Sequence, residues 1–210
     1  MRSFLKTALV AATAFGALAI GTASQAAVTT YSSLSAWEAA VGTYAETTSL
    51  GDNFSIISGF ATTNGVAVTT SGTVLTIGDG WGTWSGGYTG QVLWANATSA
   101  NFGLGSAVTG FGMFVEPDDH EVFDITLTTS NGGTITQAVD GNGGAAFFGW
   151  TGAGVTSFTL NSTSDFAAGD FFSAAGGVPE ASTWALMLLG FGGVGATLRA
   201  SRRRQATATA

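Results

Sequence analysis

The chain contains no cysteine and a single histidine, and these absences exclude several kinds of site. Without cysteine there is no disulfide framework and no thiol nucleophile, and zinc sites built from His and Cys are excluded as well. A Ser-His-Asp triad would depend on His120, and no Gly-x-Ser-x-Gly turn is present to expose a serine. We therefore expect a protein that is not an enzyme, although a pair of carboxylates for glycoside hydrolysis stays open.

Basic residues are absent from the whole middle of the chain. All six Lys and Arg lie near the two ends, whereas the thirteen Asp and Glu lie between Glu38 and Glu180. Phosphate binding requires Lys and Arg, so nucleic acid is excluded as a partner of this region. Carboxylates that cluster there must be solvated, protonated or bound to a metal ion, because no Lys or Arg can neutralise them.

The N-terminus has the pattern of a secretory signal. Arg2 and Lys6 precede an apolar stretch over 7–20, and Ser24-Gln25-Ala26 supplies small residues for signal peptidase. We expect a signal peptide over 1–26, cleaved between Ala26 and Ala27, and hence an exported protein. The alternative is a permanent N-terminal anchor.

Residues 178–204 combine a short motif, an apolar run and a basic cluster. No charged residue occurs over 181–198, and about 20 apolar residues cross a bilayer, so a transmembrane helix is expected over 182–198. Trp184 suits the membrane interface, and the arginines that follow keep the C-terminus cytoplasmic. We expect 205–210 to be disordered. The alternative is an apolar helix docked on the main domain.

This arrangement resembles the PEP-CTERM sorting tail of Gram-negative bacteria, which the membrane protease exosortase recognises. The resemblance is carried by the 186–192 run Leu-Met-Leu-Leu-Gly-Phe-Gly, by the motif before it and by the arginines after it. The motif and basic residues are Val178, Pro179, Glu180, Trp184, Arg199, Arg202, Arg203 and Arg204. Ala181 stands where the family's motif has its second proline. The resemblance implies a transient anchor in the inner membrane, cut near Pro179, and a final location at the cell surface or in an extracellular matrix.

Residues 27–177 suit a single domain with its own core. Leu34, Trp37 and Val41 predict one short helix over 32–41. Alternating apolar residues and frequent turn signals predict an antiparallel β-sandwich of the jelly-roll type. The aromatic pattern of its strands resembles exported domains of PEP-CTERM proteins, which implies the same fold. The expected strands cover 54–60, 66–70, 73–77, 91–95, 108–115, 121–129, 134–139, 145–150, 155–161 and 166–173.

An acidic turn is the first candidate site. Five acids fall within nine residues, and Ca²⁺ takes six to eight oxygen ligands, so calcium is the expected cofactor if the turn binds a metal. The alternative is a solvated turn shaped by Pro117 and the Asp pair. Asp170, in the closing strand, could add a carboxylate to a metal at a sheet edge. The ligands expected in the turn are Glu116, Asp118, Asp119, Glu121 and Asp124.

A glycine-rich stretch over 78–90 is the second candidate site. Trp81, Trp84 and Tyr88 lie on it, and their flat apolar faces with a polar edge are suited to stacking on sugar rings. The alternative is that the tryptophans fold back over one end of the sandwich.

Three functions follow from these features. The first is an exported structural or interaction protein of an exopolysaccharide-rich envelope or biofilm matrix, with exosortase and signal peptidase as processing partners. The second is a carbohydrate-binding module that uses Trp81, Trp84 and Tyr88, with calcium as an optional cofactor. The third is a hydrolase or lyase that acts on polysaccharide.

Overall fold

The computed structural model describes residues 27–106 and 108–175, together with Met187, Leu189, Gly190, Phe191, Gly193 and Arg199. These six positions have helical backbone and are exposed. Ala26, the motif Val178, Pro179, Glu180 and Trp184, the arginines Arg202, Arg203 and Arg204, most of the helix expected over 182–198, and 205–210 lie outside the described residues. Within the described part of the chain, no helix has the length and apolar character needed to cross a membrane.

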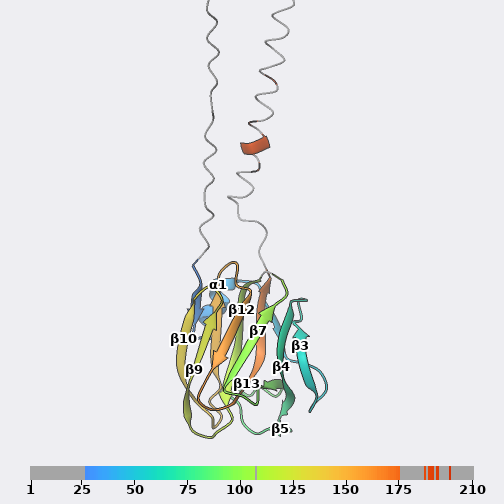
Figure 1. Ribbon diagram of the computed structural model, residues 1–210, viewed down its shortest axis with the longest axis vertical. Coiled ribbons are helices and arrows are strands. Elements are labelled where there is room, and N and C mark those ends of the chain that lie inside the picture. Colours follow the sequence, from blue (N-terminus) through green and yellow to red (C-terminus); the bar gives the residue numbers. More distant parts are fainter. Residues whose placement is uncertain are drawn as a thin grey trace, which may run out of the picture.

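Strands dominate the region from residue 27 to residue 175 (Figure 1). The single helix described there is α1 (Leu34–Val41), two residues shorter at its start than predicted. The strands are β1 (Thr29–Tyr31), β2 (Ala45–Thr47), β3 (Ile56–Ala61), β4 (Ala67–Ile77), β5 (Gly80–Trp81), β6 (Gln91–Trp94), β7 (Ser99–Leu104), β8 (Val108–Pro117), β9 (Val122–Thr129), β10 (Thr134–Asp140), β11 (Ala146–Thr151), β12 (Ser157–Asn161) and β13 (Phe166–Ala175).

The strands form one sheet that curls until its ends meet. Hydrogen-bonded neighbours follow the order β1-β11-β8-β13-β6-β4-β7-β12-β9-β10, with β2 on β13 and β3 and β5 on β4. The Oγ1 of Thr30 in β1 donates to the Thr134 carbonyl in β10 at 3.4 Å, so the sheet is nearly closed. Every pairing is antiparallel except β4 with β5. The predicted antiparallel all-β class is therefore confirmed.

One prediction about the strands is wrong. The segments expected over 66–70 and 73–77 belong to the single strand β4, and Ser71-Gly72 between them is not a turn. Gly72 is required inside the strand because a Cβ there would lie 2.6 Å from the Trp94 carbonyl oxygen. Strands β1, β2, β5 and β7 were not expected from the sequence.

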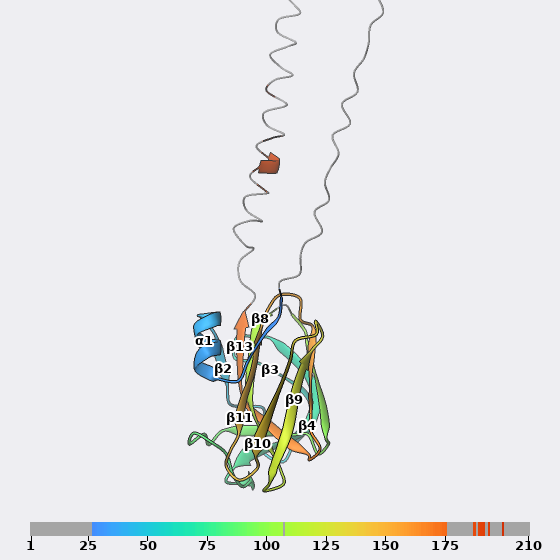
Figure 2. The same cartoon turned by 90° about the vertical axis from the view of Figure 1, so that its left-hand side faces the viewer.

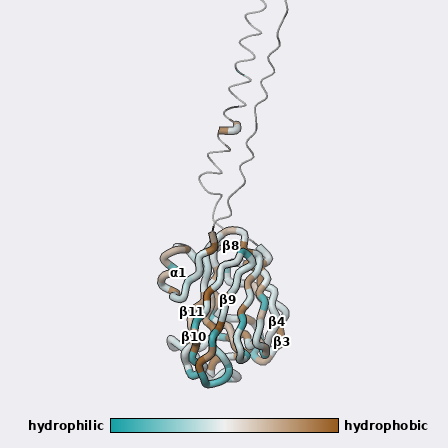
Figure 3. Tube along the Cα trace, turned by 60° about the vertical axis from the view of Figure 1, so that its left-hand side comes forward, coloured by the Kyte–Doolittle hydropathy of each residue, from teal (hydrophilic) through white to brown (hydrophobic). Residues whose placement is uncertain are grey.

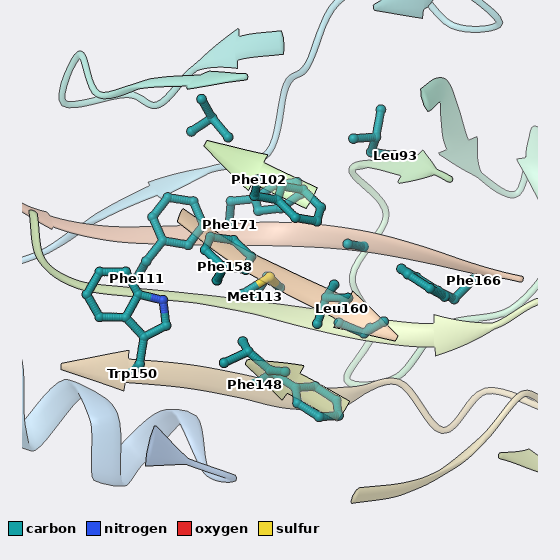
Figure 4. Packing of buried hydrophobic residues seen from close by; sticks show 14 of the residues in the cluster. Leu93, Phe102, Phe111, Met113, Phe148, Trp150, Phe158, Leu160, Phe166 and Phe171 are labelled. Atoms are coloured by element: carbon teal, nitrogen blue, oxygen red, sulfur yellow. The ribbon is translucent and has the colours of Figure 1, made fainter. Parts of the chain in front are cut away.

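The core lies between the two curved halves of the sheet (Figure 4). The rings of Phe102 and Phe158 stack at 4.8 Å, and Phe111 and Phe171 pack against them. Along β9 the residues alternate in hydropathy (Figure 3), as predicted: Ile125 and Leu127 are fully buried. Large aromatic side chains each remove much apolar area from water, so burial of this cluster stabilises the fold.

Helix α1 covers the outer face of the sheet beside β11, β8 and β13 (Figure 2). Trp37 is fully buried there, and its Nε1 donates to the Trp150 carbonyl at 3.0 Å. The ring rests on a strip of glycines: a Cβ on Gly149 would lie 2.9 Å from Cδ1 of Trp37. This packing fixes α1 on the sheet and brings Leu34 to the edge of a pocket.

Candidate ligand site

A β-bulge in the middle of β13 creates the site. The pairing of β13 with β8 shifts register between Gly169 and Phe172, and Asp170 has φ of +52°. Asp tolerates this left-handed conformation better than most residues, yet backbone strain of this kind concentrates at functional sites. Before the bulge Phe166 packs in the core, and after it Phe171 does. The extra residue thus keeps Asp170 out of the core.

The bulge coincides with a junction between two partner strands on one edge of β13. Strand β6 pairs with Ala167 to Gly169, whereas β2 pairs with Phe171 to Ser173. Asp170 lies at the gap between them, and β2 contributes Glu46, whose carboxyl group is within hydrogen-bonding reach of Asp170. Two carboxyl groups can hydrogen-bond only when they share a proton. The junction therefore holds a carboxyl pair.

Burial and the neighbouring carboxyl group favour the protonated form of Asp170. Desolvation of the half-buried side chain, then the hydrogen bond and the negative charge of Glu46, raise the pKa of Asp170 to about 7. Oδ1 of Asp170 is buried and accepts no hydrogen bond from a donor in the described part of the chain. Asp170, which lines a pocket, is thus an incompletely satisfied acceptor.

Two aromatic rings line the same pocket as Asp170. Trp84 and Tyr88 lie with their ring centroids 6.1 Å apart and their planes at 41°. Leu34 and Phe114 complete an open cavity of about 270 Å³ whose floor includes Asp170. The hydroxyl of Tyr88 donates to the Gln91 carbonyl at 2.9 Å, and its pKa is raised by burial and then by the charge of Asp170. Both rings are only partly buried.

A buried carboxylate holds the aromatic loop in place. Glu116 is fully buried, and its Oε1 accepts hydrogen bonds from the Thr83 hydroxyl at 2.8 Å and the Gly143 amide at 2.9 Å. The Ser85 hydroxyl donates to the Ala145 carbonyl at 2.7 Å. Hydrogen bonds thus fix residues 83 and 85 against Glu116 and the connection between β10 and β11. Trp84 lies between these two fixed residues.

Trp81 does not line this pocket, although the sequence grouped it with Trp84 and Tyr88. Its side chain is 5% exposed and packs with Leu75, Val92 and Ala167. The alternative expected for this loop, in which a tryptophan folds back onto the sandwich, describes Trp81. Trp84 and Tyr88 remain at the surface.

The acidic turn lines a separate open cavity through Asp119 and Glu121. Glu116 points into the interior, whereas Asp118, Asp119, Glu121 and Asp124 are exposed. The Ser164 hydroxyl donates to Oδ2 of Asp119 at 2.9 Å. Partial burial, then the nearby charges of Asp165 and Asp119, raise the pKa of Asp118.

No set of three or more His, Cys, Asp or Glu side chains is arranged to hold a metal ion within residues 27–106 and 108–175. The calcium site thus stays a prediction from the sequence, and the geometry of the turn adds no support to it.

Sequence reasoning missed the partners of Asp170. It named Asp170 as an isolated carboxylate in the closing strand and gave no role to Glu46, Leu34 or Phe114. A polar residue in the otherwise apolar run 166–172 was the one local signal, since a regular strand would place it in the core.

Comparison with known proteins adds no relative from which a function could be transferred. A scan of protein-family models finds no match to this chain. A search of curated proteins finds no match either. Function must therefore be inferred from the site itself.

Proposed function

We propose that the chain is an exported cell-surface or matrix protein whose β-domain binds polysaccharide in the pocket of Trp84, Tyr88 and Asp170. The observation that carries this proposal is the pairing of two partly exposed aromatic rings with the Asp170 carboxyl group in one open cavity. Sugar rings stack their apolar faces on aromatic side chains, and their hydroxyl groups donate hydrogen bonds to carboxylates. The buried anchor at Glu116 supports the aromatic wall.

The proposed fold is a jelly roll. The strand order supports it, because β6, β13, β8 and β11 lie side by side and β7, β12, β9 and β10 do likewise. Each successive strand from β6 to β9 therefore crosses to the other half of the sheet, as does each from β10 to β13. In this arrangement the pocket lies on the outer surface of the half that contains β13.

The proposed role is binding without catalysis. Glycosidases separate their two carboxyl groups by about 5 Å or more, which leaves room for the anomeric carbon or a water molecule. Asp170 is hydrogen-bonded to Glu46, so this pair lacks the spacing of a glycosidase. A hydrolase or lyase would release new reducing ends or unsaturated products from a polysaccharide panel, and we expect neither.

The proposed route to the cell surface uses both ends of the chain. The signal pattern over 1–26 supports export, and the resemblance of 178–204 to the PEP-CTERM tail supports sorting by exosortase in a Gram-negative bacterium. In cells with active exosortase, mass spectrometry of the surface fraction should find protein that ends near Pro179. Changing Pro179 and Glu180 to Ala should retain the uncut chain in the inner membrane, whereas Thr183→Ala should not. Uncut wild-type protein in that membrane would contradict the route.

A binding assay tests the pocket. Full-length protein in detergent is run through gels that contain envelope polysaccharide, and its retardation gives an affinity. Trp84→Ala and Tyr88→Ala should each weaken binding by about tenfold, the scale of one stacked ring. Phe54→Ala is the matched control, since Phe54 is 59% exposed and lies outside the pocket. Equal affinities in all variants would remove the assigned site.

A further inference from the structure

The pocket carries negative charge that nothing within the domain can balance. Asp170 lines the pocket, and Glu46 lies beside it. The titratable groups around these two acids are the hydroxyls of Tyr88 and Tyr44 and the carboxyl of Glu38, to which Tyr44 donates a hydrogen bond. Residues 27–177 contain no Lys or Arg. The lone His120 lines a different cavity with Asp119 and Glu121. Any positive charge in the pocket must therefore come from a ligand.

The chemistry of the pocket distinguishes between classes of saccharide. Uronic acids, sulfated sugars and phosphorylated sugars would meet the carboxyl pair with like charge. Neutral sugars would supply hydroxyl donors and leave that charge uncompensated. An ammonium group would supply both N–H donors and positive charge, and charge-assisted hydrogen bonds are stronger than neutral ones. The negative faces of the Trp84 and Tyr88 rings attract a cation as well.

We propose that this pocket recognises saccharides with a free amino group, of which a polymer of deacetylated hexosamine is the simplest example. This inference rests on the proposed polysaccharide binding and adds the ligand class. The ammonium group donates to the carboxyl group of Asp170, which lines the cavity with both rings. The sugar ring lies against Trp84 and Tyr88. An N-acetyl group would replace the charge by a neutral amide and lose this contact.

A pH dependence follows from the same geometry. The pKa of Asp170 is raised to about 7, so the empty pocket loses its proton as the pH rises toward neutrality. The ionised pair binds a cation better, so affinity for an amine should rise between about pH 5 and about pH 7. It should fall again once the pH exceeds the pKa of the ligand's own amine. N-acetylated ligands should lack this profile.

Calorimetry of the full-length protein in detergent tests the inference with three hexasaccharides: glucosamine, N-acetylglucosamine and glucose oligomers. At neutral pH the glucosamine oligomer should bind roughly tenfold more tightly than the other two, as one charge-assisted contact implies. Asp170→Asn should reduce that ratio to about threefold or less, since it removes the charge. Asn also adopts the left-handed conformation, so the bulge should persist. Glu46→Gln provides a second variant, because Glu46 is exposed and the change leaves the core intact.

The outcomes separate this inference from the function on which it rests. Asp52→Asn is the charge-matched control, because Asp52 is exposed and does not line the pocket. Equal binding of the three oligomers would overturn the amine preference and leave polysaccharide binding intact. Loss of glucosamine binding in Asp52→Asn to the same degree as in Asp170→Asn would overturn it as non-specific charge attraction. Absence of binding to all three would overturn both.

Discussion

The acidic turn after β8 and the carboxyl pair at the β13 bulge both concentrate negative charge, but the fold uses them differently. In the turn Asp118, Asp119 and Glu121 are close in the sequence, and all three are exposed. The pair joins Glu46 and Asp170, which are far apart in the sequence and meet through strand pairing. Acids that are adjacent along the chain can separate into solvent. Register brings Glu46 beside the half-buried Asp170, and the pKa of Asp170 is raised as a result.

The largest change in the free energy of unfolding is expected on the core-facing side of the β13 bulge. Phe171 follows Asp170 directly and is fully buried against Phe102 and Phe111. Phe171→Ala should lower the free energy of unfolding by about 3–5 kcal/mol, the usual cost of removing a buried phenyl ring. Val122→Ala, beside the acidic turn at 63% exposure, should change it by less than about 0.5 kcal/mol. Urea denaturation measures both changes. Similar losses in the two variants would contradict the predicted difference between the bulge and the turn.

The hydrogen bond from Thr83 to Glu116, which holds the aromatic loop, should have an intermediate effect on the free energy of unfolding. Thr83→Val removes one of the two donors to Oε1 of buried Glu116 and leaves the Gly143 amide, so the loss of one hydrogen bond should cost about 1 kcal/mol. Thr89→Val, at an exposed position of the same loop, should cost much less. Urea denaturation again provides the measurement. If the two variants were equally stable, the Glu116 anchor would have no role in the loop.

The carboxyl pair predicts a specific dependence of stability on pH. The folded-state pKa of Asp170 is about 7 against an ordinary value of 3.8, so the folded state binds the proton more tightly than the unfolded state. The contribution of Asp170 to stability is then lost as the pH rises from about 4 to about 7. Asp170→Asn removes this loss, so its unfolding temperature relative to wild type should be higher at about pH 8 than at about pH 4.

The same substitution in the acidic turn is the control for this pH effect. The pKa of Asp118 is also raised, by partial burial and the charges of Asp165 and Asp119, but its side chain is exposed. Asp118→Asn should therefore change the pH dependence less than Asp170→Asn does. If thermal melts showed a larger change in pH dependence for Asp118→Asn than for Asp170→Asn, the carboxyl group with the strongly raised pKa would lie in the turn.

Calcium gives the smallest expected effect. The turn brings no three ligating side chains together within the described residues, so about 1 mM Ca²⁺ should leave the melting temperature unchanged relative to chelator. A rise that disappears in the double variant Asp118→Asn, Asp119→Asn would restore the calcium site predicted from the sequence. It would also mean that both acidic regions bind ligands.

Local patterns in the sequence were enough to predict the antiparallel β class and the helix. Alternation at Ile125 and Leu127 and the spacing of Trp37 depend only on neighbouring residues, and both predictions are confirmed. The break expected at Ser71-Gly72 was wrong. Glycine is needed there because the Trp94 backbone of another strand leaves no room for a Cβ. Turn propensity cannot distinguish these two uses of glycine.

Half of the pocket could be predicted and half could not. Trp84 and Tyr88 belong to a loop whose composition indicates stacking, whereas Glu46 joins Asp170 only through the pairing of β2 with β13. Trp81 differs from Trp84 because β5 pairs with β4 and carries Trp81 onto the sheet. Register and bulge position decide these contacts, and neither is encoded by local periodicity.

The tryptophan indole signals test the central claim most directly. In a ¹H–¹⁵N spectrum of the full-length protein, Trp84→Phe assigns the Trp84 indole, and the corresponding variants assign Trp37, Trp94 and Trp150. Titration with a glucosamine hexasaccharide should shift the Trp84 signal and leave those of Trp37 and Trp150, which are fully buried, in place. A shift of Trp94 with Trp84 unchanged would locate the ligand elsewhere and contradict the pocket at the β13 bulge.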